Sequence, residues 1–156
     1  MKAVVRPAQL DDLHQITELW AGLASMHAPL DSTFSWTEDS LVRYREFAEE
    51  RLTDPLARLL VAEWDGSVVG FLLAVIASYP PVFTIGKYGS IYDVYVTEDC
   101  RGQGIGELLV EDVLSWFRGH GLTRAELRVH VANDVGRRFW DRMGFTPFLE
   151  NRCRSL

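Results

Sequence analysis

The chain has 156 residues, of which 47% are hydrophobic, and a formal net charge of −6. This size and apolar content predict a single domain over 1–156, because a chain of this length buries one sizeable core and leaves no room for a second. The negative balance argues against a nucleic-acid partner, which requires a basic face, and no apolar run reaches the roughly 18 residues that span a membrane.

The cysteines and the N-terminus point to the cytoplasm. Cys100 and Cys153 are the two cysteines, far apart and without a Cys-x-x-Cys or a His cluster, so neither a disulfide framework nor a metal site is expected. The first residues lack the basic-then-apolar layout of a signal peptide. Cys100 is either a catalytic thiol or an incidental turn residue beside a glycine loop.

The first half of the chain alternates strands and helices and then forms a hairpin. Asp65-Gly66 is a strong hairpin signal between two apolar runs, and Asp54-Pro55 ends the helix before them. Thr37 is a suitable N-cap for that helix. The predicted elements are a strand over 2–6, a helix over 9–26, a loop over 31–36, a helix over 38–52 and hairpin strands over 58–64 and 68–78.

The second half predicts strands and helices in strict alternation. They are a strand over 89–96, a helix over 104–119, a strand over 124–131, a helix over 134–143 and a last strand over about 145–154. Early hairpins followed by alternating elements predict an α/β fold, with a sheet that is antiparallel in its first half and covered by helices.

The most informative stretch is the strand, turn and glycine loop that run from Ile91 to Gly106. Three glycines at 102, 104 and 106 allow the backbone to approach a ligand closely where a helix begins, and a helix N-terminus attracts anions such as phosphates. A dinucleotide fingerprint is excluded because Glu107 stands where its third glycine would be, and no Gly-Lys-Ser/Thr of a P-loop follows. A glycine-rich turn without a ligand remains the alternative.

Three segments together resemble a known family. They are Arg101-x-x-Gly104-x-Gly106 after a strand, Val131-Ala-Asn-Asp-Val-Gly-Arg-Arg-Phe-Trp-Asp-Arg-Met-Gly-Phe145, and Val5-Arg6-Pro7-Ala8…Asp11. This pattern resembles the GCN5-related N-acetyltransferase (GNAT) superfamily over nearly the whole chain. The resemblance implies a mixed, mostly antiparallel sheet flanked by helices, with a splayed parallel strand pair that holds acyl-CoA.

The resemblance also implies acetyl-CoA as the co-substrate and a set of residues that bind it. In this reading the strand backbone binds the pantetheine arm, the glycine loop binds the pyrophosphate, and Asn133 touches the cofactor from the other side. As an alternative, Asn133 caps the helix that follows it. The cofactor-binding candidates are Val94, Tyr95, Val96, Arg101, Gly102, Gln103, Gly104, Ile105, Gly106, Glu107 and Asn133. One or two of Arg137, Arg138 and Arg142 lie near the coenzyme phosphates, or these arginines form a solvated face.

The candidate catalytic residues are Asp93 and Tyr92. Many family members have a glutamate at the position of Tyr92 and a tyrosine acid at the position of Trp140, so this chain departs from the pattern at both places. Asp93 is the carboxylate inside that strand, and strand alternation places it opposite Tyr92. It is either a base or a structural hydrogen-bonding group, and Tyr79, Tyr88 and Tyr95 are further candidate acids.

The expected function is acetyl transfer to a primary amine of a small molecule or peptide. A non-catalytic acyl-CoA-binding protein and a protein N-terminal or lysine acetyltransferase are the alternatives. A homodimer is predicted through the last strand. Six residues are expected to form an aromatic and acidic acceptor pocket, or to pack onto the core: His27, Asp31, Phe34, Trp36, Tyr79 and Phe83.

Overall fold

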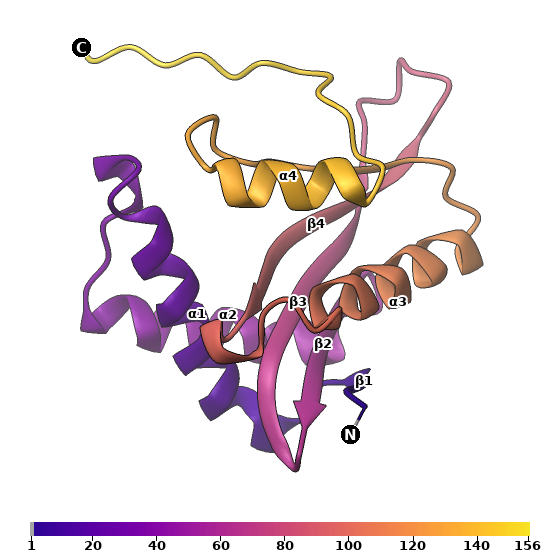
Figure 1. Cartoon of the computed structure of the whole chain (residues 1–156). Helices are drawn as coiled ribbons and strands as arrows, with labels where there is room; N and C mark the ends of the chain where they lie inside the picture. The colour runs from indigo at the N-terminus through magenta and orange to yellow at the C-terminus, as the bar shows by residue number, and fades with distance from the viewer. Residues whose placement is uncertain (1) are drawn as a thin grey trace.

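A five-stranded sheet in the order β1-β2-β3-β4-β5 forms the centre of the molecule (Figure 1). The structure is a computed structural model that describes residues 2–156. Neighbouring strands are antiparallel from β1 to β4, whereas β4 and β5 are parallel. The strands are β1 (Val4–Pro7), β2 (Ala57–Trp64), β3 (Ser67–Ser78), β4 (Lys87–Val96) and β5 (Ala125–Leu127), and the helices are α1 (Leu13–His27), α2 (Glu38–Thr53), α3 (Ile105–Gly119) and α4 (Asp134–Arg142).

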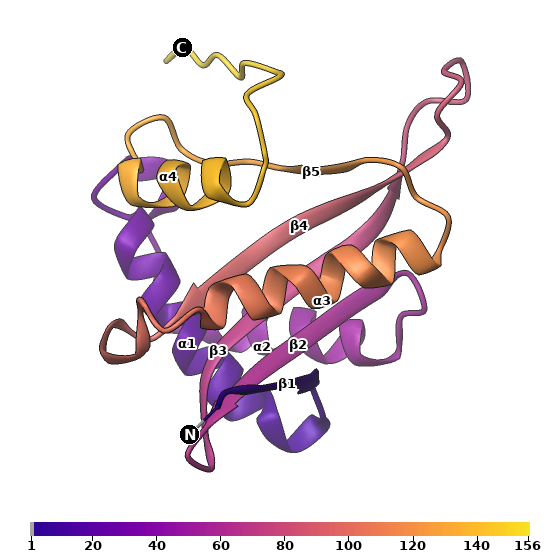
Figure 2. The same ribbon diagram turned by 45° about the vertical axis from the view of Figure 1, so that its right-hand side comes forward.

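The sheet is buried on both faces and therefore has two cores. On β3, Leu72 and Ala74 face a cluster that includes α3, while Phe71 and Leu73 face a cluster that includes α1 and α2. We call these the α3 core and the α1–α2 core. Figure 2 shows α3 against one face of the sheet and α1 and α2 against the other. Burial on both sides explains why β2 and β3 read as nearly continuous apolar runs.

Most predicted elements agree with the structure, and the hairpin agrees closely. Asp65 and Gly66 connect β2 to β3 with φ angles of 53° and 78°, the left-handed conformations that a tight hairpin turn requires. The first predicted helix begins as a 3₁₀ turn, Leu10–Asp12, before α1 starts. The mixed, mostly antiparallel sheet with helices on both faces is confirmed.

The end of the chain differs from the prediction. The strand expected over 124–131 is the short β5, and residues 145–154 form no strand. Pro147 has no N–H to give to a ladder, and side chains hold this segment instead. Phe145 packs on the α3 core, and the Arg124 guanidinium lies 4.3 Å from the ring centre of Phe148. The strand on which the predicted homodimer rests is therefore absent, and the homodimer stays a prediction.

Two negative findings apply to residues 2–156. No helix in this part of the chain combines the length and the apolar character needed to cross a membrane. Within the same residues, no three His, Cys, Asp or Glu side chains are grouped so that they could hold a metal ion.

One arginine joins the first strand to the rest of the fold. Arg6 donates two hydrogen bonds to the carboxylate of Asp12, at 2.7 and 2.9 Å, and its Nε donates to Glu63 on β2 at 2.9 Å. Asp12 is 7% exposed and also accepts the backbone N–H of Gln9 at 2.7 Å. The hydrogen bonds from Arg6 lower the pKa of Asp12, against the opposing effect of burial. The charged carboxylate is thus the form that stabilises the entry into α1.

We expect Asp12→Asn to lower the free energy of unfolding by about 2 kcal/mol at pH 7, because it removes one of the two carboxylates that bind the half-buried guanidinium of Arg6 and leaves Glu63 as the other. Asp39→Asn is the matched control, since its partner Arg43 lies 4.0 Å away on the exposed face of α2, and it should change stability by less than about 0.5 kcal/mol. Urea unfolding measures both.

The stabilisation by Asp12 depends on pH. The pKa of Asp12 is lowered in the folded protein, so its contribution to stability is present above the unfolded pKa of about 3.9 and is lost as the pH falls through the lowered value. A difference between wild type and Asp12→Asn that persists unchanged in acid would contradict this assignment.

Candidate functional site

Strands β4 and β5, the last two strands of the sheet, part partway along β4. Their paired residues are Gly89 with Ala125, Ser90 with Glu126 and Ile91 with Leu127, although β4 continues to Val96. Beyond Ile91 the edge of β4 that faces β5 has no neighbouring strand, so its backbone groups are available to a ligand. The predicted splayed parallel pair is therefore present.

A bulge in β4 lies at the point where the strands part. Ile91 is opposite Ala74 and Asp93 is opposite Leu73, so Tyr92 has no partner on β3. A bulge changes the direction of side chains locally. The prediction that alternation puts Tyr92 and Asp93 on opposite faces therefore does not apply, and both residues line the same cleft.

The opening between the strands is a cleft of about 360 Å³. It is bounded by the C-terminal turn of α1, by β4, by the glycine loop and by α4. All of the predicted site residues line it except Gln103 and Gly104. Those that do are Tyr92, Asp93, Val94, Tyr95, Val96, Arg101, Gly102, Ile105, Gly106, Glu107 and Asn133.

The three glycines of the loop serve two different purposes. Gly102 and Gly104 have φ angles of 74° and 77°, and a Cβ on either would meet no atom within 4 Å, so backbone conformation rather than space selects glycine there. A Cβ on Gly106 would instead come within 3.2 Å of the Phe139 ring, so this glycine lets α4 approach α3. The loop ends at Ile105, where α3 begins with the free N–H groups and partial positive charge of a helix N-terminus.

Arg101 ties the loop to two other elements. Its Nε donates to the carbonyl oxygen of Val96 at 3.0 Å, and one terminal nitrogen lies 3.1 Å from the sulfur of Met26 in α1. Its guanidinium carbon is 5.3 Å from the ring centre of Tyr95. This side chain fixes the position of the loop relative to the end of β4 and the last turn of α1.

Tyr95 requires a glycine on α1. A Cβ on Gly22 would lie 2.6 Å from the Tyr95 hydroxyl oxygen and 2.7 Å from its Cζ, so only glycine allows the ring to pack there. Our sequence reasoning missed Gly22. The available signal was a glycine in the middle of an otherwise regular helix, where it costs about 1 kcal/mol relative to alanine and therefore calls for a packing reason.

Asp93 is held by a tyrosine of α2. The Tyr44 hydroxyl donates to Asp93 Oδ2 at 2.9 Å, and the Tyr44 ring stacks on Trp20 with 4.6 Å between ring centres. Burial raises the pKa of Asp93, and the hydrogen bond from Tyr44 opposes this effect in part. Burial also raises the pKa of Tyr44 well above its usual value, so Tyr44 stays a neutral donor. A carboxyl group whose pKa is raised in a cleft is suited to accept a proton.

On the opposite wall, Asn133 and Trp140 belong to α4 and its entry. The Asn133 side chain accepts the backbone N–H of Gly136 at 2.9 Å, so it caps the helix and also lines the cleft. Trp140 packs edge-on between Phe139 and Phe145, at 4.8 and 5.3 Å between ring centres. The indole is thus a packing residue of the α3 core that shows one side to the cleft.

Of the six residues predicted for the acceptor pocket, His27 lines the cleft, and the other five do not: Asp31, Phe34, Trp36, Tyr79 and Phe83. Phe34 lies between His27 and His130, at 5.9 and 6.0 Å between ring centres, and joins the α1–α2 connection to the segment after β5. Burial lowers the pKa of His27. Tyr79 instead stacks on Tyr88 and packs against Phe83 away from the cleft, so placing these aromatic residues in the pocket was wrong. Trp36 contacts Trp20 at 6.1 Å, behind Tyr44.

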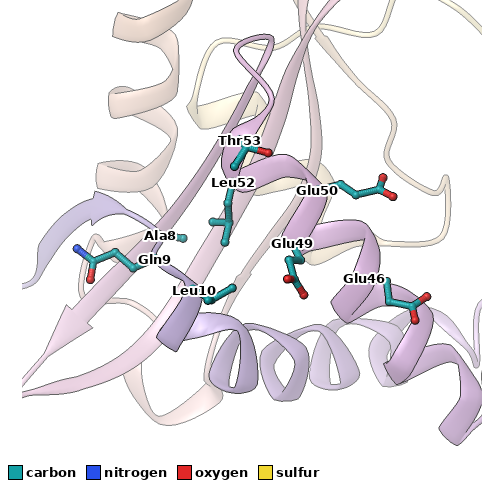
Figure 3. A pocket seen from close by; sticks show the side chains of 8 residues that line it. All are labelled: Ala8, Gln9, Leu10, Glu46, Glu49, Glu50, Leu52 and Thr53. Carbon is teal, nitrogen blue, oxygen red and sulfur yellow. The ribbon is translucent and has the colours of Figure 1, made fainter.

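A second hollow of about 710 Å³ lies between the entry to α1 and the last turns of α2 (Figure 3). Its walls include three carboxylates, Glu46, Glu49 and Glu50, beside the apolar side chains of Leu10 and Leu52. None of the predicted site residues lines it. The cleft between β4 and β5 is therefore the candidate functional site.

The family model described as the acetyltransferase (GNAT) family matches residues 16–145. The chain belongs to the GNAT family. Over 146 residues it is 27% identical to a putative [ribosomal protein bS18]-alanine N-acetyltransferase of Bacillus subtilis, covering 94% of this chain and 82% of that protein. It is 32% identical over 130 residues to the mycothiol acetyltransferase of Thermobispora bispora, covering 83% of this chain but 42% of that protein.

Solved structures agree in fold. A predicted acetyltransferase from Clostridium acetobutylicum, solved with acetyl-CoA, has a TM-score of 0.75 and 17% identity, covering 97% of this chain and 96% of that one. At this identity the likeness concerns the fold. The predicted family and fold class are both confirmed, and the relatives named here are acetyltransferases.

We expect Gly22→Ala to destabilise the protein by about 1–3 kcal/mol, because the added methyl group collides with the Tyr95 ring in a packed region. Gly119→Ala is the control, since a Cβ at this helical position meets no atom within 4 Å, and it should be neutral or slightly stabilising. Urea unfolding with the linear extrapolation measures both. Equal stability of the two variants would show that Tyr95 does not depend on Gly22.

Proposed function

We propose that this GNAT-family chain transfers an acetyl group from acetyl-CoA to a primary amine of a small molecule or a peptide. One observation carries the proposal: the N-terminus of α3, the free edge of β4 and the carboxyl group of Asp93 open into the same cleft. The first two suit a phosphate-bearing cofactor with an amide arm, and the third suits an amine that must lose a proton.

The cofactor role rests on the loop and the strand edge. Backbone N–H groups from Gly102 to Glu107 would bind the pyrophosphate at the start of α3. The backbone of Val94, Tyr95 and Val96 would pair with the pantetheine arm as a missing strand would, and an N–H there would stabilise the thioester oxygen as negative charge develops on it. Arg138 and Arg142 line the same cleft on α4 and offer positive charge to the phosphates.

The chemical step requires a neutral amine. A lysine-like amine with a pKa near 10.4 is almost wholly protonated at pH 7, so it must first lose one proton to solvent. The neutral nitrogen then attacks the thioester carbon, and Asp93 would take the second proton, which the nitrogen gives up as the tetrahedral intermediate forms. The C–S bond then breaks, the amide forms and the coenzyme leaves as a thiolate. Asp93 keeps its orientation through the hydrogen bond from Tyr44.

Many family members have a tyrosine acid at the position that Trp140 occupies in this chain. A tyrosine elsewhere in the cleft would therefore return a proton to the thiolate. Trp140 cannot release a proton at neutral pH. Tyr79 and Tyr88 stack away from the cleft, and Tyr95 packs against Gly22, which leaves Tyr92, 54% exposed, as the candidate acid. A thiol with a pKa near 8.5 needs little assistance at pH 7, so this role is the lesser of the two.

A protein substrate is the second candidate. The Bacillus subtilis relative that aligns over 94% of this chain is named for an alanine of a ribosomal protein, which supports an N-terminal peptide amine as the acceptor. Release of free thiol with a panel of small amines and N-terminal peptides distinguishes the two acceptor classes. It also distinguishes both from a protein that binds acyl-CoA without turnover.

We expect Gly104→Val to weaken acetyl-CoA binding by at least about tenfold, because a branched residue cannot hold the positive φ that the phosphate loop needs. Gly66→Val is a matched control: Gly66 has nearly the same φ, 78°, and equally open surroundings, but it lies in the β2–β3 turn. Both variants should lose similar stability, and only the first should lose affinity in isothermal titration. Unchanged affinity in a folded Gly104→Val protein would refute the phosphate-loop role.

The dependence of kcat/KM on pH tests Asp93. Its raised pKa predicts that the rate rises with pH along an acidic limb whose midpoint lies above the usual value of about 3.9, as the carboxyl group loses its proton. Asp93→Asn should remove this limb and lower kcat/KM by about a hundredfold to ten-thousandfold. Tyr44→Phe removes the hydrogen bond that lowers the pKa and should move the limb to higher pH. Asp99→Asn, an exposed carboxylate before the loop, should leave the profile unchanged.

A further inference from the structure

The two faces of the cleft differ in what they can receive. The glycine loop and α4 both pack on the α3 core, so the seat for a phosphate-bearing cofactor is on that face of the sheet. Asp93 binds Tyr44 of α2 and lies opposite Leu73 of the α1–α2 core, so it faces the other side. An acceptor amine that meets Asp93 therefore approaches from the α1–α2 side.

Strand β5 and its continuation present polar side chains to that side. Ala125 and Leu127 pack on the α3 core, so the alternate residue Glu126 points the other way and pairs with Arg124 at 2.7 Å. Arg128 comes directly after the last residue of β5, and His130, two residues further on, contacts Phe34 of the α1–α2 connection. Arg128 thus lies between the paired part of β5 and this contact with the α1–α2 connection, and it lines the cleft together with Asp93.

Arg128 differs from the neighbouring arginines in its contacts. Arg124 pairs with Glu126, Arg101 is bound to the Val96 carbonyl, and Arg137 lies 3.7 Å from Asp134. Among residues 2–156, the guanidinium of Arg128 forms no ion pair or hydrogen bond, and it lines the cleft. Arg138 shares both properties, but it belongs to α4, on the side assigned to the cofactor. Arg128 directly follows Leu127, the last β5 residue paired with β4, and Tyr92 directly follows Ile91, the last β4 residue paired with β5. Both residues therefore lie at the point where the two strands part. An unpaired guanidinium thus stands where the acceptor enters.

We infer that the acceptor amine carries an anionic group, a carboxylate or a phosphate, which Arg128 binds while Asp93 receives the proton of the amine. This inference rests on the proposed acetyl transfer and names its substrate class. A guanidinium offers paired N–H donors that match both kinds of anion. A polycationic acceptor would meet like charge at Arg128 and is disfavoured.

The test compares acceptors that share a carbon skeleton and differ in the anion, with kcat/KM expressed per neutral amine because the anion also changes the amine pKa. Each L-amino acid is assayed against its amide, and O-phosphoethanolamine against ethanolamine, by thiol release with saturating acetyl-CoA. A hydrogen-bonded pair with a charged group favours the anionic member by about tenfold to a hundredfold in kcat/KM. Arg128→Gln should abolish the preference mainly through the KM of the acceptor, and Arg128→Lys should keep part of it. Arg43→Gln, which removes a paired arginine of α2 outside the cleft lining, should change neither member of a pair.

Two outcomes would overturn the inference while acetyl transfer stands. One is turnover in which neither the carboxylate nor the phosphate pair shows a preference. The other is an Arg128→Gln variant that raises the KM for acetyl-CoA but leaves the acceptor preference intact, which would assign Arg128 to the cofactor.

If no amine is turned over, the proposed function fails, and titration of the same pairs into protein saturated with coenzyme A decides the inference. Tighter binding of the anionic members that is lost in Arg128→Gln supports it, and equal or absent binding overturns it.

Discussion

The parting of β4 and β5 after Ile91 and Leu127 is the constraint on which the rest of the site depends. Where the strands are paired, the backbone N–H and C=O groups of each form hydrogen bonds with the other. In this paired part, Gly89 allows the Phe117 ring of α3 to pack directly against β4. Once they part, β4 keeps a free row of backbone donors and acceptors beside a helix N-terminus. Such groups are costly to bury without partners, so a ligand that covers this edge would have to supply hydrogen bonds as a strand does.

The parting also gives the sheet two functional sides. Because β2 and β3 are apolar on both faces, the helices that cover them make two independent cores, and each core supports one half of the cleft. The α3 core holds the glycine loop and α4, whereas the α1–α2 core holds Tyr44 and, through it, Asp93. A reaction that brings two molecules together can thus use one opening with a separate wall for each.

The local parts of this arrangement could be predicted from the sequence, and the long-range parts could not. Asp65-Gly66 and the glycine loop act through backbone preferences of the residues themselves, so the hairpin and the start of α3 were placed correctly. Tyr44 and Asp93 are 49 residues apart, and no periodicity connects them. The bulge at Tyr92 broke the alternation used to orient Asp93, and a strand after Phe145 was expected from composition although it has no partner to pair with.

The contacts of Arg101 have a consequence for kinetics. Its guanidinium joins the glycine loop to Met26, one residue before His27 at the end of α1, and His27 contacts Phe34 in the segment that borders the acceptor side. A shift of the loop on binding a ligand would be transmitted through this side chain to the end of α1. Under the proposed function, the rate at which one substrate binds would then depend on whether the other is already bound.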